Sequence, residues 1–169
     1  YERGKARVNH KEAQELVADV VKRMRGSSET IGIVTFNAEQ QKLIENLLDA
    51  ERMSDLSLER HWDKSQTNEP VFVKNLENVQ GDERDVIYFS VAVGRDAAGR
   101  VSAQVSSLNG EGGHRRLNVA VTRARSEMVV FSSLQPEEVD LGRTNARGVV
   151  DFKHFLEFAK HGPRAIAEA

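Results

Sequence analysis

The sequence predicts an α/β fold in which a mostly parallel β-sheet is covered by helices on both faces. Short apolar runs of strand length alternate along the chain with segments whose apolar residues recur at helical spacing. The run 86–93 is apolar on both faces, as is typical of an interior strand in a parallel sheet. About a dozen residues, 74–85, separate it from the preceding strand-like run, which is near the minimum for a parallel crossover.

Composition narrows the class of protein. The 169 residues suffice for one domain of ordinary size, and 39% hydrophobic with 30% charged residues indicates a globular chain. The absence of cysteine excludes disulfides and thiolate metal sites and favours a reducing compartment, so we expect a cytoplasmic protein. No apolar run approaches the roughly 20 residues that span a bilayer, so no membrane partner is expected. Net charge is −2, so any nucleic-acid surface must be local. Residue 1 is Tyr, and we expect a piece of a larger protein.

The first half of the chain reads as helix, strand, helix. A helix over 10–25 is predicted by apolar residues at helical spacing and by Asn9, which stands three residues before Glu12 as in a capping box. The β-rich run 31–36 predicts a central strand. Asn37 can cap the next helix. The core face of that helix is predicted to consist of Leu43, Ile44, Leu47 and Leu48.

The middle of the chain is less regular. Segment 51–69 is polar and has no clear assignment, although Trp62 is expected to attach it to the body of the domain. A second strand is predicted at 71–73, followed by the strand at 86–93. The five glycines of 94–113 predict a long loop that is the most mobile interior segment of the chain.

The stretch 115–125 holds four arginines in eleven residues. Read as a helix, it places apolar residues on one stripe and puts Arg116 and Arg123 together on another face. The predicted stripe is Leu117, Ala120, Val121 and Ala124. Guanidinium groups are planar, permanently charged and able to donate two hydrogen bonds to one phosphate, so this helix could bind a polyanion. A solvated basic helix face is the alternative.

After the arginine stretch, the run 127–133 predicts a buried strand and Pro136 starts a turn. Phe152 to Ala159 mark a last helix, which ends near Gly162.

The printed sequence lacks some nucleotide-site signatures. It contains no Gly-x-x-x-x-Gly-Lys-Ser/Thr phosphate loop. Asp82-Glu83 precedes an apolar strand, whereas a magnesium-binding acidic pair of this class follows one, so we reject it as such a site. The five histidines lack the mutual spacing of a metal site. The chain alone is therefore not expected to bind and hydrolyse a nucleotide well.

The turn before the strand at 86–93 carries a second candidate site. Gly81 permits a tight turn, and the carboxylate of Glu83 beside it could accept hydrogen bonds from hydroxyl groups. A polar turn without further function is the alternative. Gln40, after the first strand, is either a functional amide or the capping partner of Asn37.

These segments resemble the motifs of one protein family. The stretch 115–125 resembles the sixth motif of superfamily 1 helicases, in the branch related to the nonsense-mediated-decay helicase. Residues 75–87 resemble the fifth motif, whose core is Gln-Gly-x-Glu. Segments 33–40 and 9–13 are similar to further blocks of this branch, and all four stand in the family's order. Residues 108–113 also resemble a subset of large bacterial helicases.

The resemblance implies a RecA-like fold and a place in a motor. Residues 1–163 would form the second RecA-like domain, and 164–169 a tail or linker. ATP with Mg would be bound mainly by the first RecA-like domain of the same chain, and the nucleic-acid partner would be single-stranded DNA or RNA. By resemblance, the nucleotide cleft would receive Gln80, Gly81, Glu83 and Gln40.

The resemblance also assigns the arginines. Arg123 matches the arginine finger, and Arg116 would support the same cleft through phosphate or the interdomain surface. Asn75 stands where relatives often have a Thr that touches the nucleic-acid backbone. Two other functions stay open: a non-catalytic nucleic-acid-binding or interaction module that keeps this fold, and an unrelated stand-alone phosphate-binding domain.

Overall fold

A four-stranded, all-parallel sheet forms the centre of the structure, a computed structural model that describes residues 7–94 and 106–167. The strands are β1 (Ile31–Thr35), β2 (Phe72–Asn75), β3 (Arg84–Ser90) and β4 (Ala124–Phe131). Their order is β2-β1-β3-β4, so the two most apolar strands, β1 and β3, occupy the interior. The predicted α/β class and the interior positions of these two strands are confirmed.

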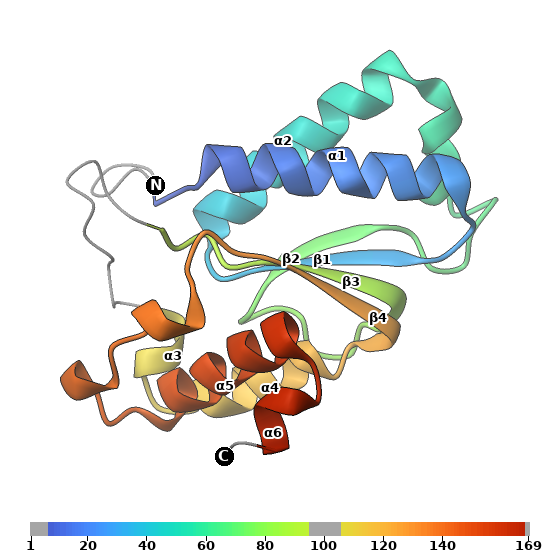
Figure 1. The fold of residues 1–169 in the computed structure, drawn as a ribbon. Coiled ribbons are helices and arrows are strands. Elements are labelled where there is room, and N and C mark those ends of the chain that lie inside the picture. Colours follow the sequence, from blue (N-terminus) through green and yellow to red (C-terminus); the bar gives the residue numbers. More distant parts are fainter. Residues whose placement is uncertain (1–6, 95–105, 168–169) are drawn as a thin grey trace.

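Helices cover both faces of the sheet (Figure 1). One face packs against α1 (His10–Gly26) and α2 (Ala38–Ser54), and the other against α4 (Gly113–Val121) and α5 (Arg147–His161). The short elements are α3 (Ser106–Asn109), α6 (Arg164–Ala167) and three 3-10 turns at Leu56–His61, Pro136–Glu138 and Leu141–Arg143. Each face therefore has its own apolar core.

Asparagine side chains set the beginning of both helices on the first face. Asn9 accepts a hydrogen bond from the backbone N–H of Glu12 at 3.2 Å, and Asn37 accepts one from that of Gln40 at 2.7 Å. Each bond satisfies one of the N–H groups that a helix leaves unpaired in its first turn. Both predicted caps are confirmed.

The segment without a sequence assignment continues α2 and then forms the 3-10 turn Leu56–His61. Trp62 follows this turn and packs against the core beneath α1 and α2. The guanidinium of Arg52 lies 4.5 Å from the centre of the Trp62 ring. Trp62 thus attaches the excursion to the domain, as predicted.

The arginine stretch is not one helix, which corrects the sequence prediction. Helix α4 ends at Val121, and β4 begins at Ala124, where it pairs with Arg84 of β3. The hydroxyl of Thr122 donates to the last carbonyls of α4 and so competes with helix continuation. Strand pairing therefore overrides helical periodicity after Val121, and Arg123 shares no helix face with Arg116.

Other boundaries also differ from the predictions. Strand β4 is half exposed and not buried, because it lies at an edge of the sheet as far as the structure describes it. Helix α5 begins at Arg147, before the apolar residues that marked it. The predicted mobile loop falls mostly on 95–105, outside the described residues, whereas 106–109 form α3 and Gly113 already belongs to α4.

The segment after Gly162 includes the single helical turn α6. The assignment of 164–169 as a tail or linker stays a prediction. Within 7–94 and 106–167, none of the helices has the length and apolar character needed to cross a membrane.

Candidate functional site

The parallel sheet separates the predicted site residues onto two opposite edges. Glu83 precedes β3 and Arg123 precedes β4, so both lie at the amino edge, where these strands begin. Asn75 is the last residue of β2 and lies at the carboxyl edge. The predicted site residues therefore form two separate groups, one at each edge of the sheet.

Two of the predicted residues meet at the amino edge. The Nη1 atom of Arg123 lies 3.6 Å from Oε1 of Glu83, with the arginine side chain 19% exposed and the glutamate 51%. Strand register explains the meeting, because Arg84 pairs with Ala124 and the Arg84 N–H donates to the Arg123 carbonyl at 3.2 Å. The two predicted motifs therefore touch through one charge pair.

Arg123 is also attached to the end of α4. Its Nε donates to the Val119 carbonyl at 3.0 Å, and its Nη2 donates to the Thr122 hydroxyl at 3.2 Å. Carbonyls at a helix carboxyl terminus lack intrahelical partners and attract positive charge. The guanidinium is therefore held in a defined place beside an exposed carboxylate.

The neighbouring Arg125 is committed to a different network. It donates to Glu69 at 2.5 and 2.9 Å, to Asp85 at 3.1 Å and to the Thr30 hydroxyl at 3.0 Å. A hydrogen bond from Arg125 lowers the pKa of Glu69. Hydrogen bonds from the backbone and hydroxyl of Thr30, followed by Arg125, lower the pKa of Asp85. Both carboxylates are thus kept ionised, and Arg125 is engaged with them.

The turn between β2 and β3 presents Gln80 and Gly81 to solvent. Gly81 has φ +89°, in the left-handed region that glycine adopts readily. The turn is anchored by an ion pair between Lys74 and Asp82 and by the buried side chain of Val79. Gln80 and Gly81 are therefore accessible next to the Glu83–Arg123 pair.

Asn75 is engaged inside the protein. Its side chain is only slightly accessible, since the whole residue is 8% exposed. Its Oδ1 accepts from the Glu77 N–H at 3.0 Å, and its Nδ2 donates to Oε1 of Gln41 at 3.1 Å. The Asn75 amide could donate to a phosphate only if it gave up its hydrogen bond to Gln41.

Gln40 is fully buried at the carboxyl edge. Its side-chain oxygen accepts from the Asn9 N–H at 2.9 Å, and its Nε2 donates to the Asn9 carbonyl at 3.2 Å and to the Ser90 hydroxyl at 3.1 Å. The backbone of Gln40 completes the predicted Asn37 cap, whereas its side chain reaches α1 and not Asn37. Gln40 therefore joins α1, α2 and β3, and lies away from the Glu83–Arg123 pair.

Arg116 is also separate from Arg123. It lies in the first turns of α4, and its Nη1 donates to the Ser107 carbonyl of α3 at 3.1 Å. The Ser107 hydroxyl in turn donates to the carbonyl of Phe36, which follows the end of β1. Arg116 thus faces the carboxyl edge, whereas Arg123 follows the opposite end of α4.

A family model described as an AAA domain matches residues 1–135. This span contains all four described strands and every predicted site residue. The chain belongs to this family.

Two relatives of this AAA-domain chain carry the same kind of name. The uncharacterised ATP-dependent helicase MG140 of Mycoplasma genitalium is 37% identical over 142 residues, which make up 77% of this chain and 12% of that protein. Its homolog in Mycoplasma pneumoniae is 35% identical over 149 residues, 83% of this chain and 13% of that protein. The predicted relationship to superfamily 1 helicases is confirmed. The chain spans about an eighth of the length of these relatives.

Sequence reasoning missed the role of Glu12 in this AAA-domain chain. Glu12 is 4% exposed, and its carboxylate accepts hydrogen bonds from the Ser90 hydroxyl and the Ala92 N–H at 2.7 and 2.8 Å. It also accepts from the Ser133 N–H and the Asn9 amide at 3.2 and 3.3 Å. Glu12 therefore ties α1 to the segments that follow β3 and β4.

Burial raises the pKa of Glu12, and the hydrogen bonds that it accepts act in the opposite direction. Ala92 has φ +57°, a conformation that is costly for a residue with a Cβ. The bond from its N–H to Glu12 helps to hold that conformation. The Asn-x-x-Glu spacing indicated a helix cap, but no local pattern indicates a carboxylate that reaches two distant strand ends.

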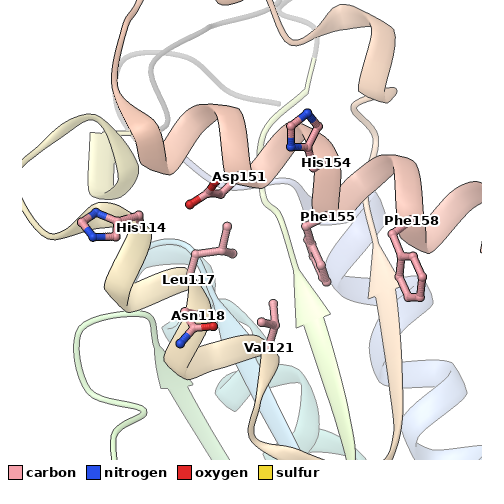
Figure 2. A pocket seen from close by; sticks show the side chains of 8 residues that line it. All are labelled: His114, Leu117, Asn118, Val121, Asp151, His154, Phe155 and Phe158. Carbon is pink, nitrogen blue, oxygen red and sulfur yellow. The ribbon is translucent and has the colours of Figure 1, made fainter. Parts of the chain in front are cut away.

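A groove of about 350 Å³ lies between α4 and α5. Figure 2 shows Leu117 and Val121 from α4 opposite Phe155 and Phe158 from α5. Polar groups complete the lining: His114, Asn118, Asp151 and His154. Among the residues that the structure describes, no group of three or more His, Cys, Asp or Glu could hold a metal ion.

Proposed function

We propose that this chain is the second RecA-like domain of a longer ATP-dependent helicase or translocase that acts on single-stranded DNA or RNA. The observation that carries the proposal is the pair formed by Arg123 and Glu83 at the amino edge, 3.6 Å apart. The family match and the two relatives named ATP-dependent helicases support it.

In this proposal the first RecA-like domain binds ATP with Mg, and the present domain closes on it. Arg123 then neutralises the charge that develops on the transferring γ-phosphoryl group. The half-exposed Glu83 carboxylate can accept hydrogen bonds from ribose hydroxyls when a phosphate replaces it beside the Arg123 Nη1 atom. Gln80 and Gly81 border the same cleft, since they are exposed in the adjoining turn.

The carboxyl edge takes the remaining roles. We assign the nucleic-acid track to this edge, with Asn75 as its phosphate contact after release from Gln41. Arg116 supports the interdomain surface by holding α3 to α4. The Gln40 side-chain amide is hydrogen-bonded to Asn9 and Ser90 within the domain. Gln40 therefore supports this edge by holding α1, α2 and β3 together. Hydrolysis reopens the cleft and moves the strand across both domains.

The chain of 169 residues on its own is expected to show no nucleic-acid-stimulated ATPase activity, because its sequence has no phosphate loop. Its affinity for ATP should be about millimolar or weaker. Equilibrium dialysis and a steady-state phosphate-release assay check both expectations, with the longer protein as the positive control.

Robust turnover by the pure chain, or tight nucleotide binding, would contradict the proposal and favour a stand-alone phosphate-binding domain. A longer protein that binds nucleic acid but hydrolyses no ATP would favour the non-catalytic module instead.

A further inference from the structure

The contacts of Arg123 use one edge of its guanidinium and leave another edge open. Nε and Nη2 lie along one edge of the planar group, and these atoms donate to the Val119 carbonyl and the Thr122 hydroxyl. Nη1 points instead toward Glu83, whose carboxylate is half exposed. The edge formed by Nε and Nη2 is therefore fixed to the end of α4. Nη1 faces the Glu83 carboxylate, which another anion such as a phosphate could replace.

The Thr122 hydroxyl has a defined direction. It lies 2.9 Å from the Asn118 carbonyl and 3.0 Å from the Val119 carbonyl, both of which can only accept. Its single proton is thus directed at the helix, and its lone pairs are left for the Arg123 Nη2 atom. Thr122 therefore links the last turn of α4 to the arginine, since its hydroxyl donates to carbonyls of that turn and accepts from Arg123.

This arrangement matters for a residue that must act in a transition state. An arginine side chain loses rotamer entropy when it is fixed in place. A guanidinium that is already held in the correct plane needs little reorganisation when charge develops on the phosphoryl group. Loss of one contact made by Nε or Nη2 should therefore slow the reaction more than it weakens nucleotide binding.

We propose that Thr122 is a positioning residue for Arg123, whose hydroxyl holds the guanidinium in the plane in which it meets the γ-phosphate. The inference rests on the proposed function, because it presumes that Arg123 acts on the nucleotide. Thr122 acts in this inference through its hydrogen bond to Arg123 and not by contact with ATP or the reacting atoms.

The test uses the longer protein with Thr122→Val, which removes the hydroxyl but keeps the shape. The kcat for ATP should fall about tenfold, in line with one lost hydrogen bond to a charged group, with KM changed less than about twofold. Thr122→Ser should restore kcat to within about twofold of wild type. Thr144→Val is the matched control, since it removes another contact between a threonine hydroxyl and the backbone, in which the Ala146 N–H donates to the Thr144 hydroxyl.

A second arm adds Thr122→Val to Arg123→Ala. If Thr122 acts only through Arg123, the added change has no further effect on kcat. Wild-type kcat in Thr122→Val, or the same tenfold loss in the Arg123→Ala background, would overturn the inference. If Thr122→Val does not fold, Thr122→Ala replaces it in both arms. The proposed function is judged separately by Arg123→Ala alone, because normal turnover in that variant would overturn both proposals.

Discussion

Arg123→Ala in the longer protein should lower ATP turnover by about 10³-fold or more, as expected when an arginine finger is removed. Nucleotide binding should fall much less, because the finger acts mainly on charge that develops in the transition state. Arg123→Lys should rescue poorly, since lysine offers a point charge and no planar fork to share between α4 and a phosphate. Steady-state ATPase assays with saturating nucleic acid measure all three effects.

The matched control is Arg115→Ala, which removes an exposed arginine from α4, the helix that precedes Arg123. Its turnover should stay close to that of the wild type. The domain should also remain folded after Arg123→Ala, because the bonds that are lost join the arginine to the exposed end of α4 and to the half-exposed Glu83. Near-normal turnover, or a melting temperature far below that of the wild type, would contradict the role given to Arg123.

The second large effect concerns stability. Glu12→Ala should lower the free energy of unfolding of the chain by about 3 kcal/mol or more, because the donors from Ser90, Ala92 and Ser133 lose a buried acceptor. For a domain of this size the melting temperature should fall by roughly 10 °C. Thermal unfolding followed by circular dichroism measures the change.

Glu15→Ala is the control for Glu12, since it is the same substitution one turn later on α1. Glu15 is exposed and forms a 3.9 Å surface pair with Lys11, so its loss should change stability by less than about 0.5 kcal/mol. Equal melting temperatures for the two variants would show that the buried carboxylate does not hold α1 to the strand ends.

Local patterns predicted most of the fold. Helical spacing located α1 and α2, and Asn9 and Asn37 cap them as expected. The uniform apolar character of β3 placed it inside the sheet. These signals come from residues that are close together in the sequence, so they can be recognised without knowledge of the tertiary structure.

The errors arose where distant contacts compete with local periodicity. The spacing of Leu117, Ala120 and Val121 continues to Ala124, but pairing with β3 converts Ala124 to strand. The same switch separates Arg116 from Arg123, which a continuous helix would have placed on one face.

The candidate site also combines residues that local patterns indicated with contacts that only the tertiary structure shows. Family resemblance assigned Glu83 and Arg123 to one nucleotide cleft, but the contact between them depends on the register of β3 with β4, which the sequence analysis did not predict. The buried roles of Glu12 and Gln40 depend on partners 78 and 50 residues away, at Ser90 in both cases. No local pattern carries that information.

If Arg123 completes an ATP site formed with another domain, the longer protein should lose affinity for a transition-state mimic when Arg123 is removed. ADP with aluminium fluoride and ADP alone would be titrated into the longer protein, as wild type and as Arg123→Ala. We expect the substitution to weaken binding of the mimic by about a hundredfold or more and that of ADP by less than about threefold. Equal effects on both ligands, or no effect on the mimic, would contradict this role of Arg123.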